Sequence, residues 1–222
     1  MYTPVDDERW QKGSTREIKF WRYWLSLHAD EYTMDRSLRL YLLGFLDGLK
    51  QATIADIGAG AACLIGNLHP QQIPISIVAS DVLADEYKIL WDEIGKQPRI
   101  PVEKQDMRQL TYPDNSFDVV HCSNALDHCP DPMCAVTEMV RVCKPKGWIY
   151  LRHMKDVGRM ARYGGLHQWN IFRTEDKDLR VWRGHPRSNG FHMSKLLPGL
   201  KTRQNYDLQG EGVRMIGIWR KP

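Results

Sequence analysis

A glycine-rich turn with an acid just before it is the part of the sequence best suited to chemistry. In the stretch TIADIGAGAA, an apolar run leads through Asp56 into the turn at residues 58–60. Glycines at such a turn let the backbone bend sharply and let a ligand approach the main chain closely. A dinucleotide-binding fingerprint would need a further glycine at position 63, where this chain has Cys63. The turn therefore predicts a small-molecule site that differs from a typical pyrophosphate-binding loop.

Other polar residues follow neighbouring apolar runs. Asp81 ends the run ISIVASD, and a carboxylate there can accept two charge-assisted hydrogen bonds from adjacent hydroxyls. Its alternative role is the N-cap of the next helix. Three histidines are candidates for a general base, because an unperturbed imidazole has a pKa of about 6.5; they are His128, His153 and His167. His128 fits a packing role equally well, and the strand position of His153 could face the core.

The cysteines could in principle form a metal site or disulfides. There are five of them, an odd number, at positions 63, 122, 129, 134 and 143. Structural zinc sites usually bring their ligands in close pairs such as C-x2-C, and this chain has no such pair. We therefore expect free thiols in a reducing compartment and no structural metal.

Composition narrows the class of protein. The chain has 222 residues, 42% of them hydrophobic and 26% charged, with a net charge of +4, which suits a single folded domain. Basic and acidic residues are mixed along the chain, so a nucleic-acid partner is not expected. No apolar run reaches the length of a membrane helix, and the start MYTPVDDERW does not resemble a signal peptide. We expect a cytoplasmic protein with no membrane span, and the oligomeric state stays open.

The elements that must position these residues alternate along the chain. Apolar periodicity predicts helices at 17–28 and 37–50. Short runs rich in Ile and Val then predict buried strands at 53–58, 75–80, 117–123 and 148–154, with helices between them at 62–68, 84–95 and 131–144. This alternation predicts an α/β fold with a doubly wound, mostly parallel sheet that binds ligands at the carboxyl ends of its strands. Further on we expect a hairpin at 167–183, a short helix at 191–197 and a terminal antiparallel pair at 201–209 and 213–221.

Four segments, taken in order, resemble class I S-adenosylmethionine-dependent methyltransferases over roughly residues 50–154. Asp56, Gly58 and Gly60 match the motif D/E-x-G-x-G-x-G, with Ala62 in place of its last glycine. Asp81 matches the acid that ends the second strand. The remaining two segments are QDMRQLTYPDNSFDVVHCSNALDHCPDP and EMVRVCKPKGWIYL, where Lys146 replaces a glycine of the usual turn.

The resemblance implies a fold, a cofactor and a set of residues. The fold would be the Rossmann-like seven-stranded sheet of this family, here with an N-terminal helical cap and an inserted β-hairpin. The cofactor would be S-adenosylmethionine. The residues implied to bind it are Asp56, Gly58, Ala59, Gly60, Asp81, Val82, Asp106, Met107, Ser123 and Asn124.

A looser resemblance concerns the acceptor of the methyl group. GLHQWN at 165–170, with a Phe-Trp pair near the N-terminus, is similar to a bacterial subset of these enzymes linked to sugar and polysaccharide modification. It implies that Trp21, Gln168 and Trp169 bind substrate. Of the candidate bases, His128, which lies just past the fourth strand, and His167, which stands in GLHQWN, are the residues expected to be catalytic. The alternative is that the tryptophans belong to the core, as such residues commonly do.

We therefore expect one methyltransferase domain, 1–222, acting on a small-molecule or glycan hydroxyl. Its parts would be a helical cap (1–50), a cofactor-binding core (51–154), an insert (155–200) that forms part of the cap, and terminal strands (201–222). Two alternatives are a non-catalytic cofactor-binding partner subunit and a nicotinamide-dependent oxidoreductase. An RNA methyltransferase should show a basic, aromatic extension, and we interpret the basic run at 180–187 as a solvated loop. The sequence leaves open the acceptor, the methylated atom, and whether a divalent metal assists.

Overall fold

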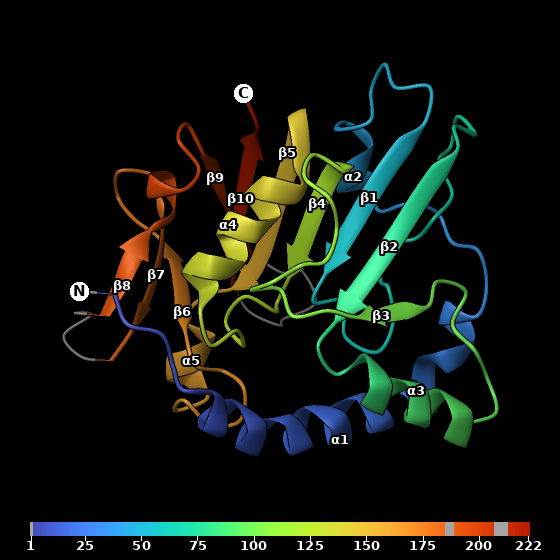
Figure 1. Cartoon of the computed structure of the whole chain (residues 1–222), viewed down its shortest axis with the longest axis horizontal. Helices are drawn as coiled ribbons and strands as arrows, with labels where there is room; N and C mark the ends of the chain where they lie inside the picture. The colour runs from blue at the N-terminus through green and yellow to red at the C-terminus, as the bar shows by residue number, and fades with distance from the viewer. Residues whose placement is uncertain (1, 185–188, 207–212) are drawn as a thin grey trace.

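A seven-stranded sheet forms the centre of the molecule, seen in a computed structural model that describes residues 2–184, 189–206 and 213–222. The strand order is β3-β2-β1-β4-β5-β10-β9 (Figure 1). β1 to β5 run parallel, whereas β10 is antiparallel to both β5 and β9. The strands are β1 (Ala52–Ile57), β2 (Ile75–Asp81), β3 (Val102–Lys104), β4 (Phe117–Ser123), β5 (Cys143–Met154), β9 (Lys201–Tyr206) and β10 (Val213–Arg220). The predicted Rossmann-like, mostly parallel sheet is confirmed.

Alternate residues of the central strands pack on opposite faces of this sheet. Ile54 of β1 and Val119 of β4 lie side by side in the register and join a cluster with Leu42. Their neighbours Ala55 and Val120 join the cluster on the other face. That face is covered by α4 (Pro132–Val142), which buries Ala135, Val136, Met139 and Val142. Because both faces are covered, the strands are apolar throughout rather than alternating, as buried parallel strands require. The cysteines are all free, and those at positions 63, 122, 129 and 143 are buried.

The first helix is much longer than the predicted 17–28. α1 spans Asp7–Tyr32, and the side chain of its N-cap, Asp6, accepts a hydrogen bond from the backbone N–H of Arg9. Its buried residues include Trp21, Leu25 and Ala29, which recur every fourth position and so share one face. The helix runs across the carboxyl ends of the parallel strands and packs against α3 (Ala84–Glu93) (Figure 1).

Two predicted helices are wrong. In the segment 37–50, only α2 (Leu40–Leu43) is helical. The segment 62–68 forms no helix; its backbone pairs instead with residues 36–39, as in the bond from Leu38 N to Leu68 O at 2.8 Å. This long-range pairing satisfies backbone groups that a helix would otherwise pair internally, and the segment buries Ala62, Cys63 and Ile65.

The region 155–200 contains the predicted hairpin and one further strand. β6 (Asn170–Arg173) and β7 (Leu179–Arg183) form the hairpin, and β8 (Asn189–His192) adds a third strand. Of the predicted helix at 191–197, only a 3-10 turn (Met193–Lys195) is present, and α5 (Val157–Met160) was not predicted. β6 lies against β9 and β10, so the hairpin flanks the antiparallel part of the sheet rather than capping the parallel strands (Figure 1). Residues 185–187 of the basic run and 207–209 of the predicted strand lie outside the described residues.

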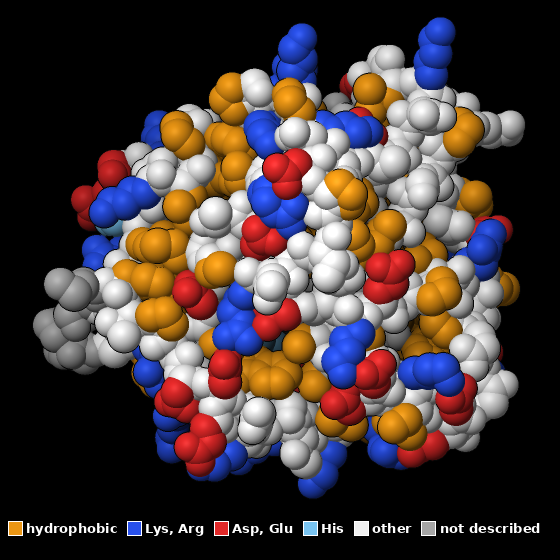
Figure 2. Space-filling view, in the orientation of Figure 1, with side chains coloured by type: hydrophobic (Ala, Val, Ile, Leu, Met, Phe, Trp, Pro, Cys, Tyr) orange, Lys and Arg blue, Asp and Glu red, His pale blue; other side chains and the backbone are white. Residues whose placement is uncertain are grey.

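The surface carries both signs of charge. Figure 2 shows Lys and Arg side chains interspersed with Asp and Glu over the face that it presents. Among the described helices, none is long and apolar enough to be a candidate for crossing a membrane.

Candidate active site

A cavity of about 810 Å³ lies where the parallel strands end and α1 crosses them. Its walls come from the segments that follow β1, β2 and β4, and from α1. The implied cofactor residues all line it: Asp56, Gly58, Ala59, Gly60, Asp81, Val82, Asp106, Met107, Ser123 and Asn124. Trp21, His128 and His167 line the same cavity. The fold thus gathers almost all of the predicted site into one place.

The turn after β1 has a backbone that requires glycine. Gly58 and Gly60 have φ angles of 72° and 68°, in the left-handed region that other residues rarely adopt. A Cβ at Gly58 would lie 2.3 Å from the Cβ of Ala125, and one at Gly60 would lie 2.0 Å from Trp21 Cζ2. Both positions therefore need glycine, because Ala125 and Trp21 occupy the space that a side chain would fill, and both glycines line the cavity.

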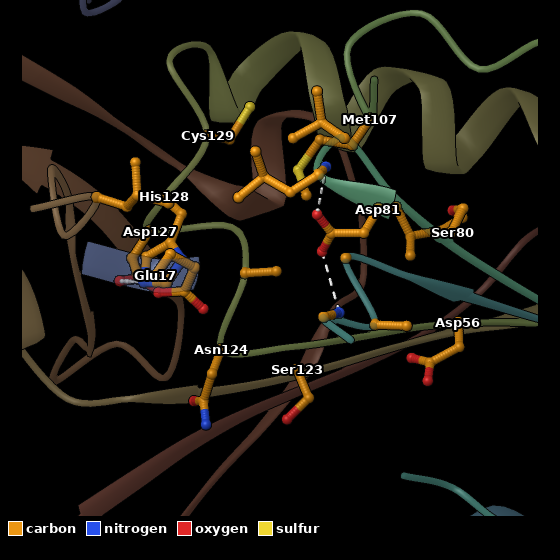
Figure 3. Close-up of a pocket in the computed structure, with 18 of the residues that line it drawn as sticks. Glu17, Asp56, Ser80, Asp81, Met107, Ser123, Asn124, Asp127, His128 and Cys129 are labelled. Atoms are coloured by element: carbon orange, nitrogen blue, oxygen red, sulfur yellow. Dashed lines mark hydrogen bonds and ion pairs between the residues drawn. The ribbon is translucent and has the colours of Figure 1, made fainter. Parts of the chain in front are cut away.

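Asp81 faces this turn from the end of β2. Its Oδ2 accepts from the backbone N–H of Gly60, and its Oδ1 accepts from that of Leu83, both at 3.0 Å (Figure 3). α3 begins at Ala84 with Leu83 at its N-cap, so the alternative role of Asp81 as that cap is wrong. Burial raises the pKa of Asp81 to about 6, although the two backbone N–H groups oppose the shift. Each oxygen keeps capacity for a further hydrogen bond from a ligand.

The carboxylate of Asp56 contacts a histidine, His121, that the sequence analysis did not single out. His121 Nδ1 lies 2.7 Å from Asp56 Oδ1, and both side chains are buried. The imidazole lies beside Tyr41 and Tyr150, whose rings stack on each other with their centroids 4.8 Å apart. The two residues are partners in the register of β1 and β4. The signal that could have identified His121 is that it is a titratable residue inside a mostly apolar strand.

Asp106 is engaged in an ion pair at the cavity wall. Arg108 Nη2 lies 2.7 Å from Asp106 Oδ2, and Arg108 Nη1 lies 2.7 Å from Asp7 of α1. Burial tends to raise the pKa of Asp106, but the hydrogen bonds and charge of Arg108 outweigh it, and the pKa lies below its usual value. Met107 borders the glycine turn, since a Cβ at Gly58 would lie 3.0 Å from its Cε.

The two predicted catalytic histidines meet at a buried carboxylate. His128 Nε2 lies 2.9 Å from His167 Nδ1, and His167 Nδ1 in turn lies 2.8 Å from Asp127 Oδ2. Asp127 is 1% exposed and was not predicted, although it directly precedes His128. Burial tends to raise its pKa, but the neighbouring histidines hold it below the usual value. Burial alone would lower the pKa of His167. The hydrogen bond and the charge of Asp127 outweigh this effect, so the pKa of His167 is raised.

The third candidate base, His153, is placed elsewhere. It is fully buried, does not line the cavity, and neither ring nitrogen has a hydrogen-bond partner among the described residues. Burial lowers its pKa to about 4, so the ring is neutral. It faces the core, as one of the two expectations had it.

Two of the predicted substrate residues do not reach the cavity. Trp169 is 0% exposed; its Nε1 donates to the carbonyl of Cys129, and its ring stacks on Tyr2. Gln168 is 1% exposed and accepts a hydrogen bond from Arg9. Both predictions are wrong, because the backbone N–H groups of these residues donate to the carbonyl of Asp127 and turn the segment inward. Trp21 does line the cavity, and its Nε1 donates to Glu17.

Comparisons with known proteins agree with this geometry. Residues 55–151 match the family model described as a methyltransferase domain. A ubiquinone biosynthesis O-methyltransferase of Nitrosomonas europaea is 30% identical over 118 residues, which is 51% of this chain and 48% of that protein. The chain spans about half the length, or less, of the curated relatives it matches.

Two solved structures share the fold at low identity. One is a SAM-dependent methyltransferase from Methanosarcina mazei, with a TM-score of 0.51 at 16% identity over 85% of this chain and 99% of that one. The other belongs to the complex between the Haloferax volcanii Trm112 methyltransferase activator and a methyltransferase, with a TM-score of 0.57 at 16% identity over 93% and 96%. Motif order, sheet topology and the family match coincide on the same segment, residues 55–151, which is similar to a methyltransferase domain.

Proposed function

We propose that the protein transfers a methyl group from S-adenosylmethionine to a hydroxyl oxygen of a small molecule, with sugars and other glycans as the favoured class. The observation that carries the proposal is that one cavity holds both the implied cofactor residues and the pair His128–His167. At about 810 Å³ the cavity is near the upper end of the range for ligand sites, roughly 300–1,000 Å³, so it has room for an acceptor beside a cofactor.

The residues around the glycine turn are assigned to the cofactor. S-adenosylmethionine supplies a methyl group already activated on a sulfonium, so the protein mainly has to hold and align the reactants. Asp81 is suited to the ribose, because a carboxylate accepts from two adjacent hydroxyls. The tight turn at Gly58 and Gly60 lines the cavity and suits close approach of the rest of the molecule to the main chain.

The opposite part of the cavity is assigned to the acceptor. An oxygen nucleophile loses a proton during the transfer, and His128 and His167, backed by Asp127, are the cavity residues proposed to manage it. Aromatic side chains of α1 also line the cavity and offer flat apolar surfaces for the C–H faces of a sugar; they are Trp10, Phe20, Trp21 and Trp24, of which Trp21 lies against Gly60 on the cofactor side.

Calorimetry with S-adenosylhomocysteine tests the cofactor half of the proposal. We expect wild-type protein to bind it and Asp81→Ala to weaken binding by about 1.5–3 kcal/mol, the range for hydrogen bonds to a charged group, which is about 10- to 150-fold. Asp85→Ala is the matched control, because this acid lies four positions further on and pairs with Lys104 at the surface. Folded wild-type protein without affinity would disprove the proposal.

A panel of acceptors tests the other half. Release of S-adenosylhomocysteine is measured with free sugars, glycosides, phenols and amines at equal concentration. We expect the sugars to give the highest kcat/KM. Turnover confined to the amines would exclude an oxygen acceptor.

A further inference from the structure

Three side chains from two separate segments each place one nitrogen or oxygen atom in a small cluster. Asp127 Oδ2, His128 Nε2 and His167 Nδ1 all lie within 4.8 Å of one another. The separations are 2.8 Å from His167 to Asp127, 2.9 Å from His167 to His128, and 3.5 Å from His128 to Asp127. The three atoms therefore form a triangle rather than a chain.

Hydrogen bonding alone does not account for this triangle. An imidazole nitrogen carries either one hydrogen or one lone pair, directed outward in the ring plane. His167 Nδ1 nevertheless has two partners at nearly equal distance, and a single hydrogen or lone pair can point at only one of them. One short contact is thus left without a well-directed hydrogen bond.

A bound metal ion accounts for all three contacts. Nitrogen and oxygen ligands lie about 2.0–2.2 Å from Zn²⁺. With angles of roughly 90–110° at the ion, such ligand atoms are about 2.8–3.6 Å apart, which spans the observed separations of 2.8, 2.9 and 3.5 Å.

We propose that Asp127, His128 and His167 bind a divalent transition-metal ion, with Zn²⁺ as the reference ion, and that its remaining coordination positions face the cavity. Two imidazoles and one carboxylate suit Zn²⁺ and its neighbours, whereas Mg²⁺ and Ca²⁺ prefer oxygen ligands throughout. All three residues line the cavity, so the ion is reachable by an acceptor.

The surroundings favour a cation at this point. Asp127 is buried, and Glu17 of α1 lines the same cavity and acts electrostatically on His167. The backbone N–H groups of Gln168 and Trp169 donate to the carbonyl of Asp127, at 2.9 and 3.2 Å. These bonds hold the two segments that carry the ligands together without an ion. Binding of an ion would therefore cost little conformational entropy.

The catalytic role of the ion rests on the proposed function, whereas its binding does not. A metal ion lowers the pKa of a hydroxyl that coordinates it. The acceptor's proton would leave to solvent, its oxygen would form the new bond to the methyl carbon, and the carbon–sulfur bond would break to leave a neutral thioether. With the ion bound, the metal site replaces the two histidines as the group that manages the acceptor's proton, and His128 and His167 would serve as its neutral ligands.

The test uses the metal alone as probe. The full chain is stripped with a chelator and titrated with Zn²⁺ by calorimetry, and with Co²⁺ by visible absorption. We expect His167→Ala and His128→Ala each to weaken Zn²⁺ binding at least about tenfold and to change the Co²⁺ spectrum. His69→Ala is the matched control, because this histidine lies in the loop between β1 and β2, outside the cavity. Mg²⁺ should not compete.

Two results would overturn the proposal: no Zn²⁺ binding by folded wild-type protein, or equal affinity in all of these variants. Because Asp127 is buried and its replacement can unfold the protein, the histidine variants carry the test, and a thermal melt accompanies each. S-adenosylhomocysteine affinity is measured on the same samples. Metal binding without cofactor affinity would contradict only the methyltransferase proposal. Cofactor affinity without metal binding would contradict only the metal proposal.

Discussion

Asp81 shows how one buried carboxylate couples ligand binding to pH. Its pKa of about 6 lies above the ordinary value of 3.8, because burial disfavours the ionised form. The ionised group therefore opposes folding at neutral pH: its contribution to stability is present below the unfolded pKa and is lost as the pH rises through about 6. A ligand whose hydroxyls donate to Asp81 needs this same ionised form.

We predict that affinity for S-adenosylhomocysteine is constant above about pH 7 and falls below about pH 6, approaching tenfold per pH unit. The reason is that the free protein binds a proton at Asp81 which the ligand must displace. Calorimetry between pH 5 and 8 measures the profile. In Asp81→Asn the profile should be flat; a wild-type profile that is itself flat would contradict the assignment of Asp81 to the cofactor.

Trp169 is expected to act on stability, not on acceptor binding. We predict that Trp169→Ala lowers the free energy of unfolding by about 3–5 kcal/mol, the usual loss when a buried aromatic ring is removed. Urea titration measures this. The milder Trp169→Phe should fold and keep KM for the acceptor within about twofold, because the ring does not reach the cavity. A large rise in KM with unchanged stability would restore the assignment of Trp169 to substrate binding.

At the scale of elements, Gly13 lets α1 lie close to the segment that carries His167. A Cβ at Gly13 would lie 2.6 Å from both the carbonyl carbon and the oxygen of Gly165. These are backbone atoms, which cannot turn aside as a side chain can. The contact sets the distance between α1 and the segment that carries His167.

We therefore predict that Gly13→Ala destabilises the protein by about 1–3 kcal/mol, the typical effect of overpacking. Alanine is intrinsically the better residue inside a helix by about 1 kcal/mol, so without this contact the substitution would stabilise. Gly44→Ala is the control, because Gly44 has helical dihedrals and nothing within 4 Å of an added Cβ. Chemical denaturation compares the two variants; stabilisation by both would show that the contact is not tight.

The sequence predicted best those elements whose signals are local. β4 was placed at its observed bounds, because its apolar run lies between polar residues on both sides. The segment 62–68 was misjudged because its pairing with residues 36–39 depends on chain that is distant in sequence. The start of α1 was missed because its first turns bury little apolar surface and are marked chiefly by the Asp6 cap.

The site residues divide in the same way, into those marked by local sequence and those brought together only by the fold. Asp56, Gly58 and Gly60 belong to one short pattern that covers the end of β1 and the turn after it, and Asp81 ends β2, so local sequence was enough to find them. The meeting of His167 with Asp127 joins residues 40 apart in sequence, and no spacing rule gives it. His121 and the inward turn of Trp169 also depend on strand register and backbone pairing that only the fold defines.

At the scale of the whole molecule, cofactor binding should be visible as stability. A ligand at about 100 times its Kd stabilises the folded state by about 2.7 kcal/mol. For a chain of this length that corresponds to a rise in Tm of about 5–11 °C. We predict such a rise with S-adenosylhomocysteine and a smaller one for Asp81→Ala at the same concentration, measured by differential scanning fluorimetry. Equal shifts in the two proteins would contradict the role of Asp81.

The position of β10 has a consequence for synthesis. This strand follows the nine others along the chain, yet it lies between β5 and β9 and supplies Met215 and Trp219 to the core. While a ribosome is still making the chain, the cofactor half of the sheet can assemble, but one edge of β5 has no neighbour. An unpaired, apolar strand edge invites pairing with another nascent chain. We expect the interval before β10 emerges to be the time when this protein most needs a chaperone.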